Sequence, residues 1–142
     1  MIRKLQKTDL NRVAAIWLDT NIKAHHFISK QYWQSNFDMV KEMFAQAEIY
    51  MYENEQQRIQ GFVGLDEEYI AGIFVSEEVQ SQGIGKLLLD FVKERKRKLH
   101  LNVYQKNKRA IRFYQREGFE IQCESLDEAT REKEYAMIWQ KK

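Results

Sequence analysis

The sequence predicts an α+β fold in a single domain spanning residues 1–142, and three observations predict it. The chain before Gly61 contains no glycine, and its apolar residues recur at helical spacing. From residue 48 the spacing changes to the alternation and short apolar runs of strands. A turn with two glycines at residues 80–85 then leads into a clearly amphipathic helix.

The first part of the chain is expected to hold an edge strand and two helices. Residues 2–5 are short enough for a strand at the edge of a sheet. Thr8 or Asp9 is a suitable N-cap for a helix whose apolar face carries Leu10, Val13, Ile16 and Trp17. Residues 21–28 interrupt this pattern. Ser29 is a suitable cap for a second helix, in which apolar spacing runs unbroken from Trp33 to Phe44.

Three strands follow. Residues 48–53 and 58–65 are separated by a short polar turn and predict a hairpin. Residues 69–75 form a nearly continuous apolar run, which is typical of a buried central strand. Gly72 within that run indicates a β-bulge or a close approach of another group to the backbone.

The remaining elements alternate between helix and strand. A helix follows Gly85 and ends before the strand at residues 99–104. Asn107 is a suitable N-cap for a short helix over residues 108–117, and Gly118 is a suitable left-handed stop. Residues 119–123 and 135–139 read as two final strands. The pattern therefore predicts about four helices and six to seven strands.

The composition excludes several classes of protein. The net charge of +2 gives no reason to expect a nucleic-acid partner. The single cysteine, Cys123, cannot form an internal disulfide and indicates a reducing compartment. No Cys/His spacing resembles a zinc site, so we expect no metal. Because neither a signal peptide nor a long apolar stretch is evident, we expect a cytoplasmic protein without a membrane partner.

The segment Gln80-Ser81-Gln82-Gly83-Ile84-Gly85 is the strongest local signal. Unpaired N–H groups at a helix start favour a phosphate, and glycines let the backbone approach it. A Walker loop needs Gly at position 80 and Ser or Thr after Lys86, and a dinucleotide fingerprint needs Gly at position 88; all three conditions fail. The loops of acetyl-CoA-binding proteins remain, with a simple tight turn as the alternative.

Two segments together resemble the GNAT superfamily of N-acetyltransferases. Residues 69–86 resemble its cofactor motif, and residues 107–119 resemble its Asn-x-x-Ala-x-x-Phe-Tyr…Gly-Phe motif, in the family's order. Residues 103–107 are especially similar to the small bacterial YiaC and YjaB type. The resemblance implies a three-layer fold with a mixed, mostly antiparallel sheet, whose strands at 69–75 and 99–104 splay apart. It also implies direct transfer of an acetyl group from acetyl-CoA to a primary amine in a ternary complex.

The resemblance also implies a cofactor site. Backbone groups of Ile73, Phe74 and Val75 would pair with the pantetheine arm, and Tyr114 would be the general acid that protonates the coenzyme A thiolate. The other residues expected at the cofactor are Gln80, Ser81, Gln82, Gly83, Ile84, Gly85, Lys86, Asn107 and Ala110. Lys106, Lys108 and Arg109 would meet the 3′-phosphate, or simply form a solvated helix surface.

The acceptor side is less well defined by the sequence. Glu68 is the preferred general base among Asp66, Glu67 and Glu68, acting through water, although the three also suit a charged turn. His25, His26 and Tyr135 are candidates for the acceptor pocket. A surface loop would equally explain the two histidines, and core packing would explain Tyr135. We interpret Cys123 as structural.

Two other functions fit parts of the sequence. A regulator that binds acetyl-CoA without turnover needs only the cofactor motif. A nucleic-acid binder would use the basic run at residues 93–98, which a solvated helix end explains more simply. The acceptor is a small molecule, a protein N-terminus or a protein lysine, and the acidic turn at residues 66–68 favours a cationic one. We expect a monomer or a homodimer.

Overall fold

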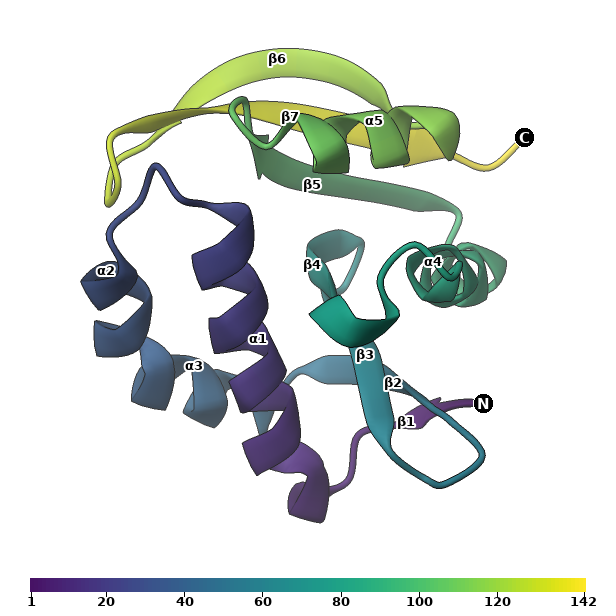
Figure 1. Ribbon diagram of the computed structural model, residues 1–142. Coiled ribbons are helices and arrows are strands. Elements are labelled where there is room, and N and C mark those ends of the chain that lie inside the picture. Colours follow the sequence, from purple (N-terminus) through teal and green to yellow (C-terminus); the bar gives the residue numbers. More distant parts are fainter.

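Seven strands form one sheet in the computed structural model, which describes residues 1–142 (Figure 1). Their order across the sheet is β1-β2-β3-β4-β5-β7-β6, and only the β4–β5 pair is parallel. The predicted mixed, mostly antiparallel sheet is therefore confirmed. The strands are β1 (Ile2–Lys4), β2 (Glu48–Glu53), β3 (Ile59–Asp66), β4 (Tyr69–Val75), β5 (Lys98–Tyr104), β6 (Glu120–Asp127) and β7 (Glu132–Gln140).

Five α-helices cover the two faces of the sheet in three layers (Figure 1). α1 (Leu10–Ala24), α2 (Lys30–Ser35) and α3 (Phe37–Phe44) pack through one apolar cluster against β2 and β3. α4 (Ile84–Arg95) and α5 (Lys108–Arg116) pack through a second cluster against the other face. Two short 3-10 turns, η1 (Lys7–Asp9) and η2 (Glu77–Val79), precede α1 and α4.

Asp9 is the N-cap residue of α1, as predicted, but its side chain does not cap that helix. Its carboxylate instead accepts from the Gln6 amide at 2.9 Å and from Arg3, whose Nη1 lies 2.9 Å away. Arg3 also pairs with Glu53, so β1, β2 and the entry to α1 are tied together. α1 also continues to Ala24, beyond the predicted break at residue 21.

The predicted second helix is two helices. Ser29 caps α2 as expected, because its Oγ accepts from the Tyr32 amide. Asn36 then ends α2, and its Nδ2 donates to the Tyr32 carbonyl at 2.7 Å. An asparagine side chain that bonds the backbone in this way competes with a continuous helix. α3 begins at Phe37, so the uninterrupted apolar spacing did not predict this break between two helices.

β4 is central in the sheet but is less buried than the sequence predicts. Only Ile70 is buried, and Ala71 is exposed. β4 and β5 pair at a single position, Tyr69 with His100, and then diverge, which confirms the predicted splay. Beyond Tyr69, the edge of β4 that faces β5 therefore has no strand beside it. Ala71 is the extra residue of a β-bulge opposite β3, as Gly72 had indicated.

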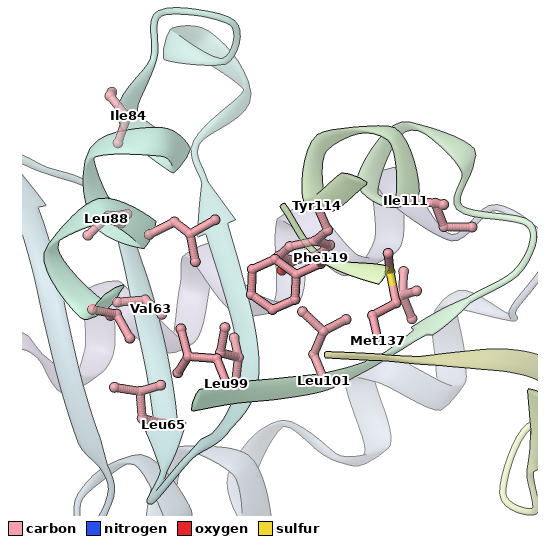
Figure 2. Close-up of a cluster of buried hydrophobic side chains, with 14 residues drawn as sticks. Val63, Leu65, Ile84, Leu88, Leu99, Leu101, Ile111, Tyr114, Phe119 and Met137 are labelled. Atoms are coloured by element: carbon pink, nitrogen blue, oxygen red, sulfur yellow. The ribbon is translucent and has the colours of Figure 1, made fainter. Parts of the chain in front are cut away.

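A second apolar cluster packs beneath α4 and α5. Leu88, Leu89 and Val92 of α4 are fully buried against strand residues such as Leu99. Figure 2 shows Tyr114 of α5 joining this cluster beside Phe119. Asn107 caps α5 by accepting from the Ala110 amide at 3.2 Å, and Gly118 ends the helix region at φ = 94°, both as predicted.

Candidate active site

A cavity of about 1090 Å³ lies where β4 and β5 part. Its walls come from α1, α2, β4, the 80–86 loop, β5, α5 and one residue of β7. Most of the residues predicted for a cofactor line it: Ile73, Phe74, Val75, Gln80, Ser81, Gly83, Ile84, Gly85, Lys86, Asn107, Ala110 and Tyr114. Gln82 is exposed and lies outside this lining.

The 80–86 loop has the geometry of an anion site. Gly83 adopts φ = 85°, a conformation that side-chain-bearing residues rarely take. The first hydrogen bond within α4 runs from the Leu87 amide to the Gly83 carbonyl. The amides of Ile84, Gly85 and Lys86 precede that bond, so they have no partner within the helix. They stand at the positive end of the helix dipole, where a diphosphate is stabilised.

Arg109 braces this loop from α5. Its Nη1 donates to Gln80 Oε1 at 2.9 Å, and its Nη2 donates to Ser81 Oγ at 3.0 Å. The Gln80 Nε2 in turn donates to the Val75 carbonyl at 2.9 Å. The two sequence motifs are therefore joined in space by one arginine. A phosphate there would meet a cation that is already oriented.

The cations near the loop differ in part from those predicted. Arg112 and Arg116 of α5 line the cavity, although the sequence analysis had not selected them. Lys106 instead pairs with Glu132 at 3.0 Å, and neither Lys106 nor Lys108 lines the cavity. The helical spacing of Arg109, Arg112 and Arg116 was the available signal, because residues three or four apart share a face.

Tyr114 lies at the inner wall of the cavity and is 7% exposed. Its ring packs edge-to-face against Phe113 and Phe119, at 5.2 and 5.4 Å between centroids. Burial raises the pKa of Tyr114, and the nearby Tyr69 adds to the effect. The phenol is therefore protonated throughout the neutral range.

His25 links α1 to the cap of α5. The Asn107 Oδ1 accepts from the Ala110 amide, so its Nδ2 is the donor in the 3.1 Å contact with His25 Nε2. The His25 proton therefore sits on Nδ1, which is buried and has no hydrogen-bond partner. Burial lowers the pKa of His25 to about 4, against a smaller opposing effect of the Asn21 carbonyl. His25 lines the cavity as a neutral ring.

Three of the residues predicted for the acceptor side lie outside the cavity. Glu68 is exposed in the β3–β4 turn, and its carbonyl accepts from the His100 amide at the point where β4 and β5 are still joined. His26 is exposed as well. Tyr135 packs against the cluster beneath α4 and α5.

Other polar residues line the cavity instead. Tyr69 of β4, Asn102 and Tyr104 of β5 and Glu134 of β7 all line it. Tyr104 donates its hydroxyl to Asp127 at 2.7 Å. The sequence analysis missed these residues because no motif contains them. Alternation along the strand at residues 99–104 was the only signal, since it puts His100, Asn102 and Tyr104 on one face.

None of the helices combines the length and the apolarity that a membrane span requires. No group of three or more His, Cys, Asp or Glu side chains is arranged to hold a metal ion.

Known proteins resemble this chain in sequence and in fold. Residues 45–121 match the acetyltransferase (GNAT) domain family. The peptidyl-lysine N-acetyltransferase YiaC of Escherichia coli is 35% identical over 98% of this chain and 96% of its own. The peptidyl-lysine N-acetyltransferase YjaB of the same organism is 26% identical over 84% of this chain and 82% of its own.

Solved structures give the same result for the fold. The solution structure of apo YjaB superposes with a TM-score of 0.88 at 23% identity, covering 100% of this chain and 98% of that one. A spermidine N-acetyltransferase from Vibrio cholerae, crystallised with CoA and spermine, gives 0.75 at 18% identity over 99% and 95%. With more than half of its length matched by the family and a relative above 30% identity, this chain belongs to the GNAT family and is an acetyl-CoA-dependent N-acetyltransferase.

Proposed function

We propose that this enzyme acetylates the side-chain amine of protein lysines, by direct attack of the amine on acetyl-CoA in a ternary complex. One observation carries the proposal. The cavity between β4 and β5 is lined by the anion loop, by Tyr114 and by polar side chains that include Glu134. A donor and an acceptor can therefore meet without a covalent enzyme intermediate.

The donor would bind along β4. Beyond Tyr69 this strand has no neighbour on its β5 side, so backbone groups of Ile73 to Val75 are available there. An amide-containing pantetheine chain adds to such an edge as an extra strand would. Its diphosphate would then reach the amides of Ile84 to Lys86, with Arg109 beside them. A free N–H of β4 would polarise the thioester carbonyl.

Tyr114 would act on the leaving group. Because burial raises the pKa of Tyr114, the phenol keeps its proton until the thiolate forms nearby. As the C–N bond forms and the C–S bond breaks, the phenol donates to the sulfur. The proton that the new amide nitrogen loses then restores the phenol. The products are the acetylated amine and coenzyme A with a free thiol.

The names of two relatives support lysine as the acceptor. YiaC and YjaB are both named as peptidyl-lysine acetyltransferases. The acceptor side also suits a lysine, since Trp33 and Tyr104 offer aromatic surface for its methylenes and Glu134 offers a negative charge.

The test is acetylation of an N-terminally blocked peptide with one lysine. Mass spectrometry should find a single acetyl group on that lysine, and thiol release should match it in amount. A peptide with arginine in place of the lysine is the control, and spermidine and an unblocked peptide are parallel acceptors. Turnover of spermidine or of the α-amine, with the blocked lysine peptides unmodified, would refute the lysine proposal.

A further inference from the structure

Glu134 is the one acidic side chain on the acceptor side of the cavity whose carboxylate is unengaged. It lies on β7 directly opposite Tyr104 of β5 and lines the cavity. The Gln105 side chain donates to the backbone carbonyl of Glu134 and not to its carboxylate. Its acidic neighbours are occupied: Glu132 pairs with Lys106 at 3.0 Å, and Asp127 accepts from Tyr104 and from Thr130.

Glu134 lines the same cavity as Tyr69 and Tyr114. Burial, and then the charge of Asp127, raise the pKa of Glu134. Burial, and then the charge of Glu134, raise the pKa of Tyr69. Tyr69 in turn contributes to the raised pKa of Tyr114.

We propose that Glu134 is the general base, which takes the proton from the acceptor's ammonium group once the lysine has entered the cavity past Tyr104. The step converts R–NH3⁺ and the carboxylate to R–NH2 and the carboxylic acid. The free amine then attacks the thioester carbonyl, and the carboxylic acid returns its proton to water after the product leaves. This inference rests on the proposed lysine acceptor, but it applies to any ammonium acceptor.

A half-buried carboxylate suits this task better than an exposed one. A free lysine has a pKa of about 10.4, so in water almost all of it is protonated at neutral pH. Burial penalises both charged partners and therefore favours the neutral acid and amine over the ion pair. Glu68 lacks this advantage, because it is exposed in its turn.

The other titratable groups around Glu134 do not replace it. Asp127 of β6 is held by hydroxyl donors, and His25 of α1 is neutral with its Nε2 engaged by Asn107. Tyr32 of α2, Tyr69 of β4 and Tyr104 of β5 all have a raised pKa, burial being the first cause in each. They are therefore protonated and cannot act as bases near neutral pH.

The decisive variant is Glu134→Gln, which keeps the shape of the side chain and removes its basicity. At pH 7, kcat with the lysine peptide should fall about 10²- to 10³-fold. The rate should then recover about tenfold per pH unit toward pH 9, because the free amine becomes more abundant. The wild type and the control Glu132→Gln, two residues away on β7 and outside the cavity lining, should not show that steep recovery.

Retention of wild-type kcat and of the wild-type pH profile by Glu134→Gln would overturn the proposal. The affinity of each variant for acetyl-CoA shows that it is folded and should match the wild type. If Glu134→Gln does not fold, Glu134→Asp replaces it in the test. Glu134→Asp should retain partial kcat with the wild-type pH profile. A steep rise of its rate toward pH 9 would also overturn the proposal. If the wild type acetylates only spermidine, the lysine assignment fails, and the same comparison with spermidine still tests the base.

Discussion

Lowering the pH should destabilise this protein through one histidine. His25 is 9% exposed, and its ring stacks on Trp33 with 5.4 Å between centroids. The ring accepts from Asn107, and its buried Nδ1 makes no hydrogen bond. The folded protein therefore resists protonation of His25, whereas the unfolded chain does not.

The size of the effect follows from the difference in pKa. Burial lowers the pKa of His25 from 6.5 to about 4, a difference of about 2.5 units at about 1.4 kcal/mol per unit. Above pH 6.5 the ring is neutral in both states, and its contribution to stability is fully present. As the pH falls, only the unfolded chain takes up the proton. About 2 kcal/mol is lost by pH 5 and about 3 kcal/mol by pH 4.

Urea unfolding at pH 7 and pH 5 measures this loss. Wild type, His25→Gln and His26→Gln should be compared, since Gln at position 25 can still accept from Asn107 and the exposed His26 is the neighbouring control. The free energy of unfolding should drop by about 2 kcal/mol more in wild type and His26→Gln than in His25→Gln. Taking the difference between variants cancels the titration of carboxylates common to all three.

Equal pH dependence in wild type and His25→Gln would refute the reasoning. It would mean that the folded protein accommodates a charged ring at position 25, through water or a local movement of α1. The burial argument would then fail for this end of the cavity, and the neutral state assigned to His25 would fail with it.

Four further substitutions test the donor half of the site. Tyr114→Phe should lower kcat by about 10²-fold or more while the Kd for acetyl-CoA, measured by calorimetry, changes little. Gly85→Ala should leave stability nearly unchanged, since the new Cβ would meet the Phe113 ring at an ordinary 3.6 Å. It should nevertheless weaken acetyl-CoA binding, because the Cβ would block the loop. Gly83→Ala should instead lower the free energy of unfolding by about 1 kcal/mol, because Gly83 has φ = 85°. Arg109→Ala should raise the Kd for acetyl-CoA about tenfold with little change in melting temperature, because hydrogen bonds to charged groups are worth about 1.5–3 kcal/mol. If both Gly85→Ala and Arg109→Ala bind acetyl-CoA with unchanged affinity, the diphosphate of the cofactor does not bind at this loop.

The predictions that the structure confirmed depend on short stretches of chain. Ser29 and Asn107 were identified as caps because each can bond an amide three residues ahead, and both do so. Gly118 was identified as a stop on the same local basis. The break at Asn36 was missed because the apolar spacing continues across it. Asp9 is the predicted cap position, but its side chain bonds Arg3, which belongs to a strand that pairs with β2.

The candidate site divides along the same line. The donor half consists of two contiguous segments, and twelve of its thirteen predicted residues line the cavity. The acceptor half is assembled by strand pairing. Tyr104 and Glu134 meet because β5 and β7 are adjacent in a particular register, and a shift of one residue would turn Glu134 to the other face. No local sequence pattern predicts the register between β5 and β7.

Glu68 and Glu134 show how much depends on the point where β4 and β5 separate. Both carboxylates are near these strands, and the sequence favoured Glu68 because it immediately precedes β4. The strands are joined at Tyr69 and His100, however, so the end of β4 next to Glu68 is closed by the pairing of the sheet. The opening begins further along, where Asn102 and Tyr104 of β5 have no β4 residue beside them. Glu134 faces that opening from β7, so the position of the last β4–β5 pair decides which carboxylate an incoming amine can reach.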